Sequence, residues 1–198
     1  MEVKSSIQTS PIVFESQMIT TFRTKVWSSV EWCTPCIYHG TKTQLDTIDR
    51  IQRRFLRFIG LTEEQAFLKY KLAPLSLRRS IAMLGFIYRC VRGIAPVRCC
   101  SLFTLSTATP NYNTRRQRAL HSLQLTDPIV PKSGVALRRS VYGLVAFWNA
   151  LPSDVVSADS VKKFQGMIQN AALEAITQGC SIPDACALKY IHVRYCGY

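Results

Sequence analysis

Apolar residues recur along much of this chain at three- and four-residue steps, the spacing of one face of an α-helix. The clearest stretch runs from Leu45 to Gly60 and carries two such rows at once. One row is apolar and contains Leu45, Ile48, Ile51/Gln52, Phe55 and Phe58/Ile59, whereas the other contains Arg50, Arg53, Arg54 and Arg57. Thr41, with Gln44 three residues later, predicts a capping box at the start, and Gly60 suits the left-handed conformation in which helices often end.

The same periodicity predicts further helices over residues 10–35, 63–72, 76–91, 97–105, 137–151 and 161–178. The first of them ends at Pro35 and places on one face Ile19, Phe22, Val26, Val30 and Cys33. Residues 106–132 lose the helical period, and residues 120–130 alternate loosely enough for extended chain. We therefore predict an all-α fold, an irregular helical bundle of about five to seven helices with one long basic loop.

A chain of 198 residues is long enough for one domain with its own core. Hydrophobic content of 47% and charged content of 19% are values typical of globular proteins. The pattern divides the chain into an N-terminal tail (1–15), a basic helical segment (16–105), a basic loop or linker (106–133), a C-terminal helical pair (134–178) and a tail containing Cys and His (179–198).

The charge of the chain points to a polyanionic partner. The formal net charge is +13, and between Gln65 and Thr126 there are ten basic residues, eight of them arginine, and no acidic one. Arginine suits bidentate contacts with phosphate, which favours nucleic acid over an anionic membrane surface, although a single charged row is most often a solvated helix face. The candidate nucleic-acid-binding residues are Arg50, Arg53, Arg54, Arg57, Arg78, Arg79, Arg115, Arg116, Arg118, Arg138 and Arg139, with Tyr112 as a stacking platform in the loop. Other aromatic residues near arginines, namely Phe55, Phe58 and Tyr88, lie on apolar faces and are predicted to pack in the core.

Nothing in the sequence indicates a membrane or secreted protein. No stretch approaches the roughly 20 apolar residues that span a bilayer, and the first residues lack an apolar signal segment. We therefore expect no membrane partner and an intracellular protein of the nucleus or cytoplasm, not a secreted one, in which the eight cysteines are reduced.

The sequence does not predict a catalytic or metal site. Metal-dependent polymerases need carboxylates that converge on divalent ions, but no Asp-Asp pair is present, and the nearest clusters, Asp46/Asp49 and Asp154/Asp159, lie at helix starts where capping explains them. Cys33, Cys36 and His39 have the spacing of half a zinc site, and Cys180, Cys186, His192 and Cys196 could supply further ligands. A structural zinc site usually presents two close pairs, and the spacing of the second set is looser than that of known zinc sites. We therefore favour buried or incidental cysteines and predict no cofactor.

A series of short motifs in a fixed order resembles the C-terminal part of non-LTR (LINE-type) retrotransposon reverse transcriptases over about residues 20–175. The motifs are Leu45-x2-Ile48-x2-Ile51-Gln52-Arg53-Arg54-Phe55-Leu56-Arg57-x-Ile59-Gly60, Leu72-Ala73-Pro74-Leu75-x2-Arg78-Arg79, Leu84-Gly85-Phe86-Ile87-Tyr88-x4-Gly93-x2-Pro96, Leu102-Phe103, Thr114-Arg115-Arg116, Arg139-Ser140 and Trp148-Asn149-x-Leu151-Pro152 with Phe164. The Trp-Asn-x-Leu-Pro motif is the most specific of them.

The resemblance implies that residues 16–105 are thumb-like and that the chain holds template RNA and the growing cDNA duplex of an RNA-directed DNA polymerase. The Tyr-x-Asp-Asp motif of such polymerases is absent from these residues. We therefore expect a non-catalytic fragment, with Mg²⁺ relevant only if a missing polymerase core, in another chain or upstream, completes the site. The alternative is a helical protein-interaction module that docks an acidic partner or that core.

Overall fold

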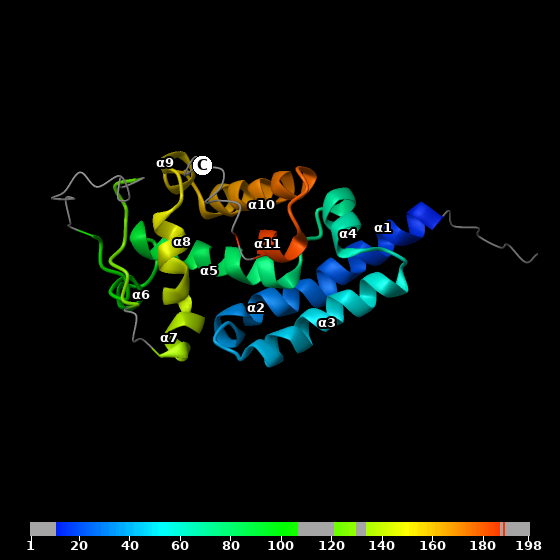
Figure 1. Ribbon diagram of the computed structural model, residues 1–198, viewed down its shortest axis with the longest axis horizontal. Coiled ribbons are helices and arrows are strands. Elements are labelled where there is room, and N and C mark those ends of the chain that lie inside the picture. Colours follow the sequence, from blue (N-terminus) through cyan, green and yellow to red (C-terminus); the bar gives the residue numbers. More distant parts are fainter. Residues whose placement is uncertain (1–10, 107–120, 130–133, 187, 189–198) are drawn as a thin grey trace, which may run out of the picture.

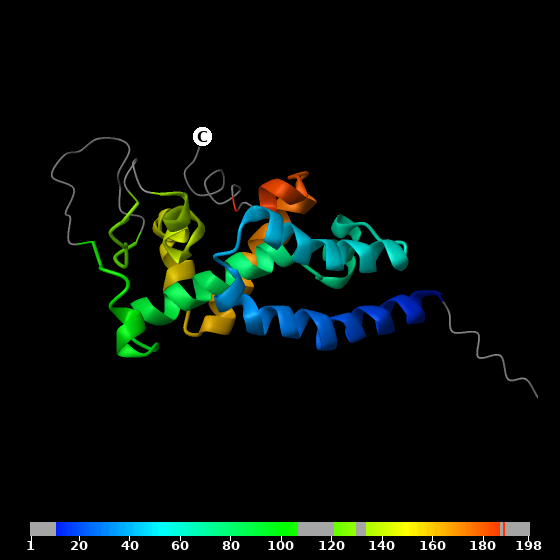
Figure 2. The same ribbon diagram turned by 90° about the horizontal axis from the view of Figure 1, so that it is seen from below.

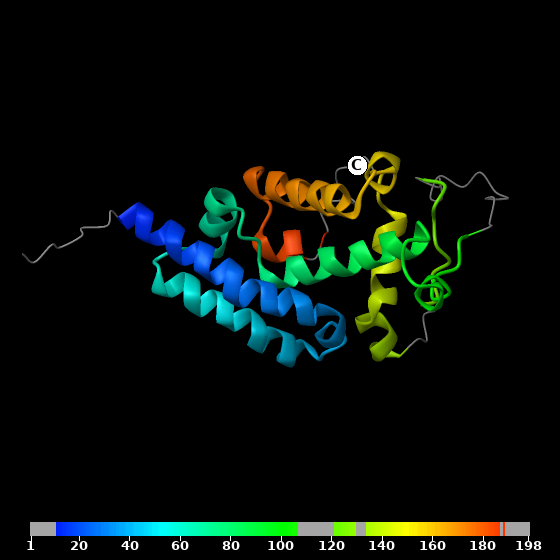
Figure 3. The same cartoon turned by 180° about the vertical axis from the view of Figure 1, so that it is seen from behind.

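The computed structural model describes residues 11–106, 121–129, 134–186 and 188. Its first helical rod joins α1 (Pro11–Phe22), the π-helical turn η1 (Arg23–Trp27) and α2 (Ser28–Ile37). The rod is unbroken because the residues at both junctions keep right-handed helical backbone angles. The next helix, α3 (Lys42–Phe58), returns beside the rod in the opposite direction, so the two form an antiparallel hairpin (Figure 1, Figure 3).

The structure corrects two predictions for the first rod. A π-helix has more residues per turn than an α-helix, so it shifts the buried face by one position beyond Trp27. As a result Thr34 is buried, whereas Cys33, which the 3.6-residue period placed on the core face, is exposed. The helix also continues past Pro35 to Ile37, because a proline in the last turn removes only a single backbone hydrogen bond.

The predicted ends of α3 are confirmed. The Thr41 side chain accepts a hydrogen bond from the Gln44 backbone N–H, and the Gln44 side chain accepts one from the Thr41 N–H. Gly60 follows the helix with a φ of 75°, a left-handed conformation in which a side chain would be strained. A second capping box begins α4 (Glu63–Tyr70), which ends two residues earlier than predicted because the backbone turns left-handed at Lys71.

The central helix is α5 (Leu75–Val91), on which the others are assembled. Figure 1 and Figure 2 show α10 (Val161–Thr177) along one side of it and the hairpin of α2 and α3 along another. After α5 come Gly93, with a φ of 68°, and a short α6 (Val97–Cys100). The helix predicted over residues 76–91 is confirmed. On its core face Leu77, Ile81, Leu84 and Tyr88 are fully buried, and Val91 in the last turn is half-buried.

The helix predicted over residues 137–151 is instead divided into short pieces. They are α7 (Val135–Arg139), the 3₁₀-helix η2 (Val141–Leu144) and α8 (Val145–Asn149), followed by α9 (Ser153–Val156). The break lies at Ser140, whose backbone is extended and whose hydroxyl accepts a hydrogen bond from the Tyr142 N–H. Serine competes with helix continuation in this way because its side chain offers a local backbone partner. The tail predicted after residue 178 contains a further short helix, α11 (Ile182–Cys186).

Two hydrophobic clusters form the core. The main cluster lies between α5, η2, α8, α9 and α10, and includes the rings of Tyr88, Trp148 and Phe164. The smaller cluster joins α1, α3 and α4 around Phe22 and Leu56, and Trp27 packs against both. The described residues contain one isolated antiparallel bridge, Leu105 with Leu125, and no strand, which confirms the all-α class. No helix in the described ranges combines the length and apolarity needed to span a bilayer.

Candidate nucleic-acid interface

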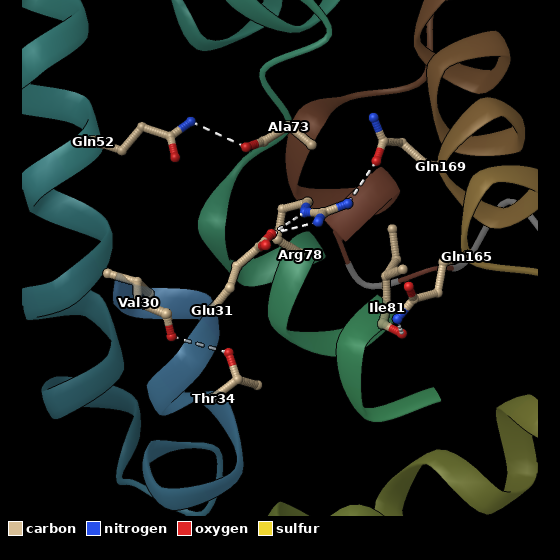
Figure 4. Close-up of polar contacts among 9 residues, drawn as sticks. All are labelled: Val30, Glu31, Thr34, Gln52, Ala73, Arg78, Ile81, Gln165 and Gln169. Atoms are coloured by element: carbon tan, nitrogen blue, oxygen red, sulfur yellow. Dashed lines mark hydrogen bonds and ion pairs between the residues drawn. The ribbon is translucent and has the colours of Figure 1, made fainter. Parts of the chain in front are cut away.

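The arginine row of α3 lies on the solvent side of that helix. Arg50, Arg53, Arg54 and Arg57 are all exposed, and none of them forms a salt bridge with an acidic residue of the described ranges. The opposite side of the helix is fixed by Leu56 in the smaller cluster and by Gln52, which donates a hydrogen bond to the Ala73 carbonyl oxygen at 3.1 Å (Figure 4). The rotation of α3 about its axis is therefore set by its buried face, and the guanidinium groups point away from the core.

An open groove runs between this row and the start of α4. Its volume is about 680 Å³, and it is lined by Asp46, Arg50, Arg53, Leu56, Arg57, Leu61, Thr62 and Glu63. Three guanidinium groups thus face two carboxylates. Burial raises the pKa of the Glu63 carboxyl, and the charge of Arg53 acts in the opposite direction. The groove has a net positive charge and is open to solvent, which suits a backbone of phosphates better than a small enclosed ligand.

The prediction that Phe58 packs in the core is wrong. Its side chain is 72% exposed, and Ile51 on the same side of α3 is 46% exposed. Phe55, in contrast, stacks on Phe22 of α1 with ring centroids 4.2 Å apart, as a core residue does. The helices that contact α3 cover the Phe55 side and leave Phe58 open beside Arg54 and Arg57. An exposed aromatic ring next to guanidinium groups is a surface on which a nucleic-acid base can stack.

Two arginines of α5 among the predicted phosphate contacts, Arg79 and Arg78, instead pair with side chains of other helices. Arg79 is 4% exposed, and its Nη1 and Nη2 atoms lie 2.6 Å and 3.0 Å from the two carboxylate oxygens of Asp49. This bidentate pair ties α5 to α3 and uses the donors that a phosphate would need. The prediction for Arg79 is therefore corrected. It failed because helical spacing alone does not indicate that the side chain of Asp49 reaches α5.

Arg78 is half-buried and joins three helices (Figure 4). Its Nε donates to Glu31 Oε1 of α2 at 2.5 Å, and its Nη1 donates to Gln169 Oε1 of α10 at 2.8 Å. Its guanidinium carbon also lies 4.8 Å from the centre of the Trp27 ring, the geometry of a cation–π contact. These contacts give Arg78 a structural position between the hairpin and α10, so we remove it from the candidate interface.

Arg138 and Arg139 are exposed in the last turn of α7. They lie across a second hollow from the turn between α2 and α3, where Lys42 begins α3. The close approach of α7 to η2 depends on Gly143, because a Cβ added there would lie 2.1 Å from the Arg138 carbonyl oxygen. This glycine therefore positions both arginines.

The remaining candidates fall into two groups. Arg115, Arg116, Arg118 and Tyr112 lie outside the described residues. Cys33, Cys36 and His39 are exposed at the end of α2 and in the turn after it. Within the described ranges, no three side chains of His, Cys, Asp or Glu gather in a way that could hold a metal ion.

Sequence reasoning missed Lys42, Asp46 and Glu63 as parts of this surface. A signal for two of them was available, because positions 42, 46, 50, 53 and 57 recur at helical steps and share one side of α3. Glu63 joins them only through the packing of α4.

Comparisons of the chain with protein-family models, curated proteins and solved structures found no match.

Proposed function

We propose that this chain binds the phosphate backbone of nucleic acid through the solvent face of α3, as a non-catalytic, thumb-like part of a reverse transcriptase of the non-LTR retrotransposon type. The observation that carries the proposal is the row of Arg50, Arg53, Arg54 and Arg57, exposed on one helix and without salt bridges in the described ranges. Arg138 and Arg139 extend this positive surface beyond the N-terminal end of α3. The family assignment depends on the sequence motifs alone.

The proposed mode of binding is electrostatic and independent of base sequence. Guanidinium groups that neutralise phosphates release condensed counterions, so the affinity falls steeply with salt. Phe58 adds a ring that can stack on an exposed base. A template–primer hybrid offers both kinds of contact, and the Mg²⁺ chemistry of polymerisation belongs in this proposal to a separate polymerase core.

A titration of a fluorescently labelled RNA–DNA hybrid tests the proposal. Four phosphate contacts predict that Kd rises by about 100-fold between 50 and 200 mM salt. Arg53→Gln with Arg57→Gln removes two charges from the row and should weaken binding. Arg98→Gln with Lys162→Gln removes two exposed charges from α6 and α10 and is the matched control. A Kd that does not change with salt concentration, or that rises equally in both double variants, contradicts the proposal.

The second candidate function is a protein-interaction module, and a specific group of exposed apolar residues favours it. Ile94, in the turn between α5 and α6, is 64% exposed, and Val97 of α6 is 85% exposed. Leu102 and Leu105, nearby in the chain, are also exposed. An apolar surface of this kind commonly marks a protein contact. If this function is correct, capture of a partner polymerase core or acidic protein survives nuclease treatment and is lost in a Val97→Asp variant.

A further inference from the structure

We propose that the hollow between α7, α5 and the start of α3 is a binding site for a terminal phosphate monoester of a nucleic-acid strand. The inference rests on the proposed function and adds a specific subsite to it. The hollow has a volume of about 320 Å³, and its lining combines cationic and hydroxyl side chains from three separate helices and a turn. The lining residues that carry the argument are Lys42, Arg138, Arg139, Ser76, Ser80 and Tyr38.

The charges around this hollow favour an anion with two negative charges. Lys42, Arg79, Arg138 and Arg139 face it together with two carboxylates, those of Asp46 and Asp49, which leaves a net charge of two positive. The charge of Arg79 is balanced by Asp49 through their bidentate pair. Lys42 and Arg139 form no salt bridge with an acidic residue in the described part of the chain. A phosphate monoester carries close to two negative charges at pH 7, and a phosphodiester carries one.

The uncharged lining of the hollow can complete such a site. Ser76 and Ser80 of α5 supply hydroxyl groups, and Tyr38 supplies a phenol. Burial raises the pKa of Tyr38 to about 12, although a hydrogen bond with Ser80 acts in the opposite direction, so the phenol stays protonated at physiological pH. Hydroxyl donors beside guanidinium groups match the three acceptor oxygens of a terminal phosphate.

The position of the hollow links it to the α3 groove. Asp46 lines both of them, so they lie next to each other along one side of α3. At 1.5 Å per residue, Lys42 and Arg57 are roughly 22 Å apart along the helix axis. A strand whose backbone follows the arginine row would therefore bring its end to the hollow. The carboxylate of Asp46 stands on this path and opposes the phosphates that pass it.

Three forms of one labelled oligonucleotide test the site: one with a 5′-phosphate, one with a 3′-phosphate and one with hydroxyl groups at both ends. One phosphorylated form should bind about tenfold more tightly than the hydroxyl form, the effect of one charge-assisted contact. Lys42→Gln with Arg139→Gln should abolish this preference, whereas Arg98→Gln with Lys162→Gln should keep it. Loss of the preference in millimolar inorganic phosphate supports the site and shows that the phosphate group alone suffices.

Equal affinity for all three forms, or a preference that survives Lys42→Gln with Arg139→Gln, overturns the inference. The Arg53→Gln, Arg57→Gln variant separates this failure from failure of the proposed function, because it should weaken every form whether or not the hollow binds phosphate. Asp46→Asn gives an independent readout. Removal of this half-buried carboxylate should raise affinity by about threefold for a strand that passes it. An unchanged affinity would contradict the proposal that the strand runs past Asp46.

Discussion

The side-chain amide of Asn149 forms a two-way hydrogen-bonded pair with the backbone of Leu125. Asn149 Nδ2 donates to the Leu125 carbonyl oxygen, and Leu125 N–H donates to Asn149 Oδ1, each at 2.7 Å. Next to it, Trp148 Nε1 donates to the Leu123 carbonyl oxygen at 2.8 Å. The Trp-Asn pair thus fixes residues 121–129 against α8, which gives the most specific sequence motif of the chain a structural role.

Substitution of Asn149 by Asp should destabilise the fold. The carboxylate can still accept from the Leu125 N–H, but it cannot donate to the Leu125 carbonyl and faces that oxygen with a negative charge. We expect the free energy of unfolding in urea to fall by about 2 kcal/mol. Asn170→Asp on the exposed side of α10 is the matched control and should change it by less than about 0.5 kcal/mol. An equal fall in the free energy of unfolding in the two variants would show that the hydrogen-bonded pair of Asn149 and Leu125 contributes little to stability.

The ion pair between Arg79 and Asp49 predicts a different pattern. Arg79→Ala leaves a carboxylate that is 18% exposed without its partner, so stability should fall by about 3 kcal/mol. The double variant Arg79→Met, Asp49→Leu removes both charges and fills similar volume, and should recover most of the loss. Chemical denaturation of the single and double variants measures both values. The double variant should also bind nucleic acid with the affinity of the wild type. A marked loss of affinity would indicate that Arg79 contacts nucleic acid after all.

His121 predicts how stability depends on pH. The ring is 7% exposed, its Nε2 lies 3.0 Å from the Trp148 carbonyl oxygen, and its Nδ1 has no partner among the described residues. Burial lowers the pKa of His121, and the carbonyl only partly opposes this. As pH falls below about 6.5, the unfolded chain therefore binds a proton before the folded one does, and stability decreases.

The measurement for His121 is the free energy of unfolding at pH 7.5 and pH 5.5 in the wild type and in His121→Gln. The wild type should lose more stability on acidification than the variant, whose amide does not titrate. Comparison with the variant removes the contribution of other groups that titrate in this range. An identical pH dependence in the two proteins would mean that His121 keeps its ordinary affinity for a proton in the folded state.

The fold could be predicted from sequence where local signals decide it. The capping box of Thr41 and the apolar rows of α5 and α10 depend on neighbours a few residues away, so local sequence patterns were sufficient to predict them. The extra residue of the π-helical turn and the break at Ser140 could not be predicted, because a prediction from apolar spacing assumes an uninterrupted helix with a constant period of 3.6 residues.

The candidate site was predicted less completely, for a related reason. The arginine row of α3 follows from its helical spacing alone. Whether an arginine of α5 faces solvent depends instead on Asp49 and Glu31, which lie 30 and 47 residues away from their partners. The exposure of Phe58 likewise depends on which side of α3 its neighbours cover. Charge and periodicity identify a basic face, but tertiary contacts decide which of its members remain available.

The most direct test of the central claim is the slope of log Kobs against log salt concentration for an RNA–DNA hybrid. The triple variant Arg50→Gln, Arg53→Gln, Arg57→Gln removes three of the proposed phosphate contacts, and each contributes about 0.7 to 0.9 to the slope. We predict that the magnitude of the slope falls by about 2 to 3, while removal of three exposed cations elsewhere, Arg89, Arg98 and Lys162, leaves it nearly unchanged. A slope in the α3 variant equal to that of the wild type would contradict the claim that this face binds nucleic acid.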